Sequence, residues 1–361
     1  MIWNWQKSDW RKFSYESSKL QHFEDDFLRY CGEVVGALKH LNTDEKNELR
    51  VTLLRDEAIQ TSKIEGEYLD RDSIQSSIRR HFGLQVTNEN KALKEQGISD
   101  LLVDVYQNFE KPLSHDLLRQ WQRKLFSSAP GSGEYRTHEE PMQVVSGAIY
   151  APTVHFEAPP SAQVHDELEA FILWYNTAHE EKSISPLILA GISHLWFECI
   201  HPFEDGNGRV GRALAEKSLS QSLGQPSLIS LSSVIEKKKS AYYEALEKAN
   251  KGNEITKWLE YFLPTMIEAQ QYSLKKIDFI IQKGKLLNQH QKQLNERQLK
   301  VVLRMFREGV EGFKGGLSAK NYMSITQISQ PTATRDLRDL VEKGVFKKTG
   351  ELRHTRYWLN I

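Results

Sequence analysis

The 361-residue sequence has few of the features that tie a chain to a membrane or to an oxidising compartment. It contains only two cysteines, Cys31 and Cys199, so it offers neither a disulfide framework nor a cysteine-based metal cluster, and we expect both to be buried free thiols. No apolar run approaches the ~20 residues that cross a bilayer. The start of the chain, MIWNWQKSDW, lacks the basic and apolar segments of a signal peptide. We therefore expect a cytoplasmic protein with no membrane partner.

The sequence also lacks an excess of charge of one sign. Lys and Arg together number 48, as do Asp and Glu, so the overall charge points to no polyanionic partner. Hydrophobic residues make up 39% of the chain, which fits a folded globular protein of two or three domains. We see no internal repeat and no low-complexity segment.

Helical periodicity dominates what is present. From Leu20 to Leu38, apolar residues recur on one helical face, and Asn42 with Glu45 forms a capping-box signature for a helix that ends near Gly66. The pattern predicts further helices over 70–81, 96–108, 115–127, 163–177, 239–250 and 255–290, and from the end of the loop at 201–206 to about 223.

Two segments of the central region stand out from this pattern. Residues 131–160 carry glycines, prolines and β-branched residues, which predict loops and one short β-hairpin around Ser146–Phe156. The segment SPLILAGISHLWFECI opens with Ser185 as a helix cap and Pro186 at the first helical position. Because this segment is apolar nearly all round, we expect a buried core helix.

The last 66 residues differ in charge from the rest. From Glu296 onward there are 13 Lys and Arg residues against 7 Asp and Glu residues. The order is one helix, a helix-turn-helix and a hairpin that turns at Thr349–Gly350, which is a winged-helix pattern. Such a domain could bind DNA, although Asp336 and Asp339 dilute the charge on its second helix. The residues that could meet phosphates are Arg335, Arg338, Lys347, Lys348, Arg353 and Arg356.

The segment HPFEDGNGRVGR, His201 to Arg212, follows the buried helix directly. Pro202 places His201 at the end of that helix, and the next helix begins after Gly206 with free backbone amides that suit an anion. Asp205 can hold one Mg²⁺ whose other ligands are phosphate oxygens and waters. Arg209 and Arg212 share a helix face and can reach phosphates. His201 can accept a hydroxyl proton near neutrality.

This segment resembles the signature of the Fic family, HPFx(D/E)GNGRxxR, at every defined position. The preceding helix, the GEYRT segment and the hairpin also look like that family, over roughly residues 50–265. The resemblance implies an all-α fold, with a Fic-type helical core and a short β-hairpin flap that holds the target backbone. It implies transfer of AMP from ATP to a Ser, Thr or Tyr hydroxyl of a target protein, with pyrophosphate leaving.

By the same resemblance, His201 deprotonates the target hydroxyl and Phe203 anchors the loop in the core. Asp205 binds Mg²⁺ between the α- and β-phosphates. Arg209 contacts the β-phosphate side and Arg212 the γ-phosphate. The phosphate oxygens are cradled by Gly206, Asn207 and Gly208.

A second segment, TSKIEG at Thr61 to Gly66, resembles the inhibitory motif (S/T)xxxE(G/N) of some Fic proteins. The resemblance implies that Glu65 pairs with Arg212 and denies it to the γ-phosphate. The tryptophan-rich start of the chain also resembles a small domain that precedes Fic cores in some bacterial proteins. We expect its aromatic residues, Trp3, Trp5, Trp10 and Phe13, to pack on the core.

A transition-metal site is an alternative for part of this region. His194, Glu198 and His201 stand four and three residues apart, a spacing that can bind a metal on a helix. Pro202 argues against that site because it pulls His201 off the helix face.

We expect three domains: an N-terminal helical domain at 1–95 with an inhibitory helix at about 43–66, a catalytic core at 96–285 and a winged-helix domain at 286–361. The expected function is Mg²⁺-dependent protein adenylylation that is inhibited by Glu65. The expected partners are ATP and a target protein, with DNA binding through the winged helix and homo-oligomers as further options. Three alternatives stay open. The scaffold could transfer phosphate, UMP or phosphocholine, it could remove AMP, or an idle core could accompany a DNA-binding regulator.

Overall fold

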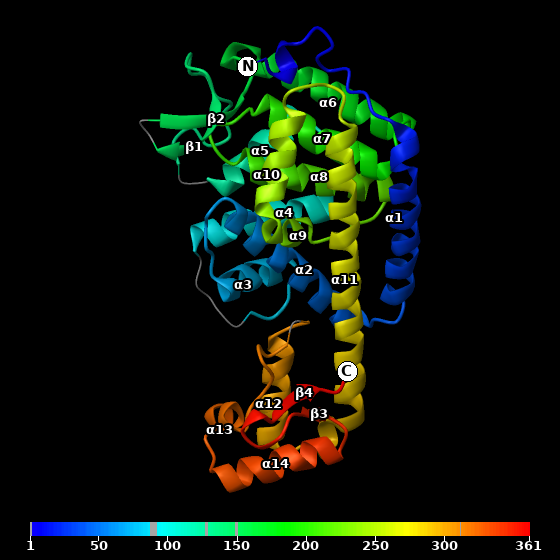
Figure 1. The fold of residues 1–361 in the computed structure, drawn as a ribbon, viewed down its shortest axis with the longest axis vertical. Coiled ribbons are helices and arrows are strands. Elements are labelled where there is room, and N and C mark those ends of the chain that lie inside the picture. Colours follow the sequence, from blue (N-terminus) through cyan, green and yellow to red (C-terminus); the bar gives the residue numbers. More distant parts are fainter. Residues whose placement is uncertain (1, 87–91, 127–128, 149–150, 311) are drawn as a thin grey trace. The chain divides into compact units, whose positions relative to one another are not determined.

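A computed structural model of the chain describes residues 2–86, 92–126, 129–148, 151–310 and 312–361 (Figure 1). The chain is mostly helical, as the periodicity predicted. Its α-helices are α1 (Ser17–Leu38), α2 (Thr43–Ile64), α3 (Arg71–His81), α4 (Leu93–Asn108), α5 (His115–Leu125), α6 (Val164–Glu181), α7 (Pro186–Ile200), α8 (Asn207–Leu223), α9 (Leu231–Lys237), α10 (Lys239–Ala249), α11 (Thr256–His290), α12 (Glu296–Arg307), α13 (Ala319–Thr326) and α14 (Gln330–Glu342). The strands are β1 (Gln143–Ala148), β2 (Ala151–Glu157), β3 (Phe346–Thr349) and β4 (Arg356–Leu359). Short 3₁₀ helices occupy Asn4–Gln6, Ser161–Gln163, Gln291–Gln293 and Leu352–His354.

The chain divides into two compact units. The first comprises Met1–Gly32 and Arg50–Ser273, and the second comprises Glu33–Leu49 and Leu274–Ile361. The expected division into three domains stays a prediction. No helix in the part of the chain that the structure describes is both long enough and apolar enough to cross a membrane.

The first unit is organised around α7 and α8, which pack against each other at its centre (Figure 1). Every residue of α7 except Pro186 and Glu198 is buried, which confirms the expected core helix. Gly191 is needed there, because a Cβ at this position would lie 2.8 Å from Leu259 of α11. The backbone carbonyl of Gly191 also accepts a hydrogen bond of 2.9 Å from the Trp258 indole. The close approach of α11 to α7 therefore depends on a position without a side chain.

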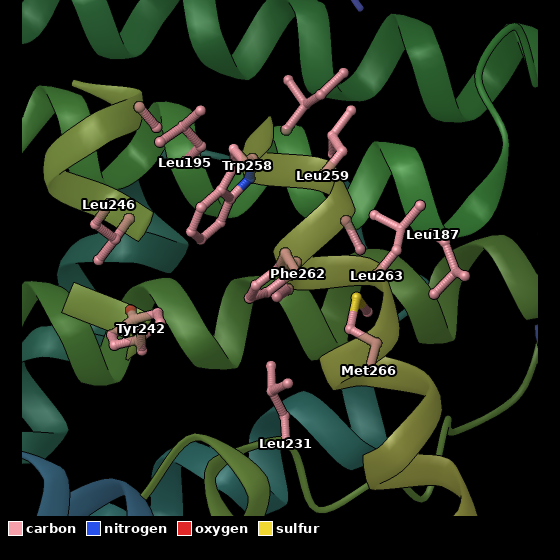
Figure 2. Close-up of a cluster of buried hydrophobic side chains, with 14 of the residues drawn as sticks. Leu187, Leu195, Leu231, Tyr242, Leu246, Trp258, Leu259, Phe262, Leu263 and Met266 are labelled. Carbon is pink, nitrogen blue, oxygen red and sulfur yellow. The ribbon is translucent and has the colours of Figure 1, made fainter. Parts of the chain in front are cut away.

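A cluster of buried side chains joins α7, α9, α10 and α11 (Figure 2). Trp258, Phe262 and Met266 project from α11 into this cluster and are at most 2% exposed. Helix α9, which supplies Leu231, was not predicted because its seven residues are too few for a periodic signal. The four aromatic residues near the start of the chain also pack on the core as expected, with Trp3 buried and the others partly buried. Of the two cysteines, Cys199 is buried and Cys31 is only partly so.

The expected hairpin is present in the central region. Strands β1 and β2 pair antiparallel, and the register shifts between Val144 and Val145, so that the β2 strand carries one extra residue there. Phe156 and Ala158 at its base are buried in the same cluster as α7. The hairpin is thus fastened to the core at one end.

The second unit contains α12, α13, α14 and the β3–β4 hairpin around a core of its own. Leu317 and Tyr357 exchange two backbone hydrogen bonds of 3.0 and 2.9 Å, which adds a single bridge beside β4. The expected tight turn at Thr349–Gly350 is wrong, because Thr349 pairs with Arg356 and a 3₁₀ helix lies between the strands.

The capping box predicted for Asn42 and Glu45 is confirmed by two reciprocal hydrogen bonds of 2.9 Å.

Replacing Phe262 with alanine tests the core of the first unit. The side chain is fully buried, so we expect Phe262→Ala to lower the free energy of unfolding by about 3–5 kcal/mol. Leu173→Ala, at a side chain that is 67% exposed, is the control and should change it by less than about 0.5 kcal/mol. Scanning calorimetry measures both, and a Phe262→Ala loss no larger than the control's would contradict this packing.

Candidate active site

The loop between α7 and α8 holds the residues singled out by the sequence. Helix α7 ends at Ile200, and His201 follows in the left-handed conformation with φ of 50°. Helix α8 begins at Asn207, directly after Gly206, whose φ of 90° favours glycine. The loop therefore joins α7 to α8 through only six residues, so the amino end of α8 lies close to His201.

His201 is held through its backbone. Its carbonyl accepts a hydrogen bond of 2.8 Å from Nε of Arg136, and its amide donates one of 3.0 Å to Phe197. Burial lowers the pKa of His201 to about 4, and the Arg136 charge acts in the same direction. The imidazole is therefore neutral at pH 7 and has a lone pair that can accept a proton.

Phe203 and Asn207 clamp the loop. Phe203 is fully buried, and the Asn207 side chain accepts a hydrogen bond of 2.9 Å from the Phe203 amide and donates one of 2.8 Å to its carbonyl. The amide group of Asn207 is thus used within the loop itself. The phosphate contact expected of Asn207 would therefore have to come from its backbone, beside Gly206 and Gly208.

Asp205 lies at the mouth of this loop. Its side chain is 70% exposed, and Oδ1 accepts a hydrogen bond of 2.5 Å from the Gly206 amide. An exposed carboxylate next to an anion site is the donor type that Mg²⁺ takes in proteins, with phosphate oxygens and waters completing its shell. The residues present therefore fit the expected metal.

Arg212 lies beneath the amino end of α8 and is only 1% exposed. Its Nη2 contacts Glu65 Oε1 at 2.7 Å, and its Nε donates a hydrogen bond of 2.8 Å to Thr61 Oγ1. The structure thus brings Glu65 and Arg212 together, with both partners of the guanidinium on α2 and just after its end. Burial acts to raise the pKa of Glu65, but the Arg212 charge and hydrogen bond outweigh it and hold the pKa below its ordinary value.

The Glu65 carboxylate also covers the first turn of α8 at Gly208. A Cβ at Gly208 would lie 2.4 Å from Glu65 Oε1 and 3.0 Å from Arg212 Nη1. The carboxylate therefore lies against the first turn of α8, where backbone amides lack helical partners. An anion bound at those amides would have to share or replace this position.

Arg209 is held by a second carboxylate. It is 5% exposed, and its Nη1 contacts Glu67 Oε2 at 2.6 Å, while its Nη2 is 3.6 Å from Asp205 Oδ1. Glu67 also contacts Lys94 at 3.0 Å. Sequence reasoning missed Glu67 because it follows the glycine that ends the helical pattern, so no periodicity marked it.

A buried carboxyl pair lies behind the arginines. Glu57 of α2 accepts a hydrogen bond of 2.9 Å from the Ser232 amide and another from its hydroxyl, and it is in hydrogen-bonding contact with Glu216 of α8. Burial raises the pKa of Glu57, and burial beside Glu57 raises the pKa of Glu216 well above its ordinary value. At least one proton is therefore held between the two groups near neutrality.

The alternative metal site does not form. His194 Nε2 is 2.8 Å from the Tyr242 hydroxyl, and burial lowers the pKa of this histidine to about 3. No group of three or more histidine, cysteine, aspartate or glutamate side chains in the described ranges is placed to hold a metal ion. His194 thus belongs to the buried layer under α8. Glu198 is only partly buried as a residue, but its Oε1 atom is buried there, and desolvation raises the pKa of its carboxyl to about 8.

Comparisons with known proteins found two family matches along the chain. Residues 112–219 match the Fic/DOC family, and residues 3–84 match a domain of unknown function, DUF4172. A probable protein adenylyltransferase of Aquifex aeolicus is 28% identical over 200 residues, which is 55% of this chain and 56% of that protein. The protein adenylyltransferase Fic of Drosophila virilis is 35% identical over 86 residues, 24% of this chain and 16% of that protein. The chain thus spans about half of the first relative and a small part of the second.

Among solved structures, a Fic family protein from Desulfovibrio desulfuricans has the same fold. It aligns with a TM-score of 0.54 at 20% identity and covers 93% of this chain and 95% of its own. The matched segment at 112–219 contains β1, β2, α7 and the whole loop from His201 to Arg212. Residues 112–219 therefore form a Fic/DOC domain.

Proposed function

We propose that the protein is an adenylyltransferase that moves AMP from ATP to a Ser, Thr or Tyr hydroxyl of a target protein and that Glu65 inhibits it. The observation that carries this proposal is the Glu65–Arg212 ion pair at the amino end of α8. The names of the relatives from Aquifex aeolicus and Drosophila support the transferred group.

The proposed mechanism uses positioning and charge rather than a covalent enzyme intermediate. His201, neutral at pH 7, accepts the proton of the target hydroxyl through its imidazole. The amides at the start of α8 bind phosphate oxygens, and Arg209 and Arg212 stabilise the negative charge that develops on the pyrophosphate. Asp205 would hold Mg²⁺, which neutralises phosphate charge when bound.

Inhibition follows from the burial of Arg212. Its guanidinium cannot reach a γ-phosphate while it is paired with Glu65 and bound to Thr61. Removing one partner of a buried ion pair costs ~3–5 kcal/mol, so a nucleotide must supply a replacement for Glu65 before it can use Arg212. Arg209 is similarly engaged by Glu67.

We also propose that the second unit binds duplex DNA. The sequence predicted that Asp336 would reduce the positive charge on the surface of α14. That prediction is wrong, because the Asp336 side chain is only 5% exposed and contacts Arg297 Nε at 3.0 Å. Arg335 and Arg338 of α14 and Lys347 and Lys348 of β3 are exposed. These side chains can meet phosphates.

The first prediction from this proposal tests inhibition by Glu65. Glu65→Gly should raise the rate of protein labelling from ATP labelled at the α-phosphate by at least about tenfold, because it frees Arg212. Label at the γ-phosphate should not be retained on protein. The control is Lys63→Gly, which loosens the same helix end but leaves the Glu65–Arg212 pair intact, since Lys63 contacts only Glu236 among the ion pairs of the described residues.

Two outcomes of this experiment would count against the proposal. Retained γ-label would indicate phosphate transfer, and equal rates for Glu65→Gly and Lys63→Gly would exclude inhibition by the carboxylate. His201→Ala in the Glu65→Gly background should abolish labelling while the protein still binds ATP.

A second prediction concerns pH. Because burial raises the pKa of Glu57 above its ordinary value of 4.5, the folded state binds more protons than the unfolded state, and stability is lost as the pH rises above about 4.5. Glu57→Gln removes this loss, so the variant should gain stability relative to the parent protein between pH 5 and pH 8. Urea unfolding at the two pH values measures the difference. Glu244→Gln, at a side chain that is 66% exposed, is the control, and parallel curves for Glu57→Gln and the parent would refute the raised pKa.

A third prediction concerns DNA. Replacing Lys347 and Lys348 with alanine should weaken duplex binding and reduce the slope of log affinity against log salt by about 1–2. Lys343→Ala is the control, because Lys343 already contacts Asp339 at 2.6 Å. Fluorescence anisotropy at several salt concentrations measures both, and duplex binding that ignores salt would contradict the proposal.

A further inference from the structure

The turn that follows α2 carries two carboxylates, and each contacts a different arginine of α8. Glu65 comes before Gly66 and Glu67 after it. Glu65 Oε1 lies 2.7 Å from Nη2 of Arg212. Glu67 Oε2 lies 2.6 Å from Nη1 of Arg209. The two arginines are three residues apart and therefore share one face of α8, so two neighbouring ion pairs join this turn to that face.

The backbone at the end of α2 explains how both carboxylates reach α8. Gly66 has a φ of 83°, and its amide donates a hydrogen bond of 3.0 Å to the carbonyl of Lys63. The amide of Glu67 donates one of 2.9 Å to the carbonyl of Ser62. These two bonds around a left-handed glycine form a Schellman ending, which stops the helix and turns the chain in a defined direction. The position of Glu67 is thus fixed by the end of the same helix that presents Glu65.

Arg209 is enclosed but not fully satisfied by its neighbours. Its side chain is 5% exposed, and its guanidinium carbon lies 4.9 Å from the centre of the Phe126 ring. Besides Glu67, the nearest acidic group is Asp205, with 3.6 Å between Nη2 and Oδ1. Nε of Arg209 is buried and has no hydrogen-bond partner in the described part of the chain. A buried donor without a partner is unfavourable, and a phosphate oxygen is an acceptor that could remove this cost.

The second oxygen of Glu67 contacts a cation at the surface. Its Oε1 lies 3.0 Å from Nζ of Lys94, whose side chain is 69% exposed and belongs to the first turn of α4. Glu67 therefore bridges a buried arginine and an exposed lysine. Because Lys94 can stay paired with it, Glu67 can leave Arg209 without becoming an isolated charge.

From this geometry we propose that Glu67 is a second inhibitory carboxylate, which withholds Arg209 from the β-phosphate while Glu65 withholds Arg212 from the γ-phosphate. This inference rests on the proposed adenylyltransferase function and extends the regulation of that site. Removal of Glu65 alone then leaves the site partly inhibited. Because the two carboxylates oppose different phosphates, nucleotides that differ by one phosphate separate their effects.

The test compares ADP with AMP on the full chain carrying Glu65→Gly, with and without Glu67→Gln. Calorimetry in the presence of Mg²⁺ measures the affinity for each nucleotide. We expect Glu67→Gln to strengthen ADP binding at least about fivefold, because a neutral amide competes less well than a carboxylate for Arg209. AMP has no β-phosphate, so its affinity should stay the same.

Glu95→Gln in the same background is the matched control. Glu95 stands next to Lys94 on α4, and its Oε1 accepts a hydrogen bond of 3.1 Å from the Asp70 amide instead of contacting an arginine. This change removes the same charge from the same region, so equal gains in ADP affinity for Glu95→Gln and Glu67→Gln would overturn the inference.

A change that merely loosened the end of α2 would raise the affinity for ADP and AMP alike, and that result also overturns the inference. Arg209→Met gives a further check, because Glu67→Gln should have little effect on ADP binding once the arginine is absent. An undiminished gain in the Arg209→Met background would mean that Glu67 acts through another group, which contradicts the inference.

The proposed function is reported separately by protein labelling from ATP labelled at the α-phosphate in the Glu65→Gly chain with cell lysate. Labelled protein together with an unchanged ADP affinity in Glu67→Gln overturns the second inhibitory carboxylate and leaves the adenylyltransferase function standing. Binding of no adenine nucleotide to any of these variants, with no labelled protein, overturns both.

Discussion

A buried positive charge governs this site. Arg212 is only 1% exposed, and a guanidinium removed from water must be paired and hydrogen-bonded to be tolerated. Thr61 of α2 and Glu65, just after its end, supply that pairing. The same requirement explains how a nucleotide could compete, because a phosphate oxygen offers the charge that Glu65 provides. In the proposed mechanism, inhibition and activity then depend on which anion is bound to Arg212.

The surroundings of Arg212 are built to keep it in place. Helices α7 and α8 are buried on nearly all sides, and the loop between them is clamped by Phe203 and Asn207. Glu57 and Glu216 share protons behind it and join α2 to α8. Helix α2 is therefore held at two points, by Glu57 within it and by Glu65 just after its end. Its displacement would disturb a buried polar layer as well as the partly buried Glu65–Arg212 pair.

Much of this arrangement could be predicted from the sequence, and the limits have physical reasons. Contiguous motifs are readable because their spacing is fixed by one turn and one helix, which is why the loop from His201 to Arg212 and the buried helix before it were found. The Glu67–Arg209 and Glu57–Glu216 contacts join residues more than 140 positions apart and leave no local signal. Helix α9 has too few residues to show a periodic pattern. The connection between β3 and β4 contains a 3₁₀ helix, which the Thr-Gly pair in the sequence does not predict.

A double-mutant cycle on ATP binding tests the competition for Arg212 most directly. The affinity for Mg²⁺-ATP is measured by calorimetry for the parent protein, Glu65→Gly, Arg212→Met and the double variant. If Glu65 and phosphate compete for Arg212, then Glu65→Gly strengthens ATP binding at least tenfold, about 1.4 kcal/mol, when Arg212 is present and has little effect when it is absent. An equal gain in both backgrounds would mean that Glu65 acts without Arg212, and the central claim would be wrong.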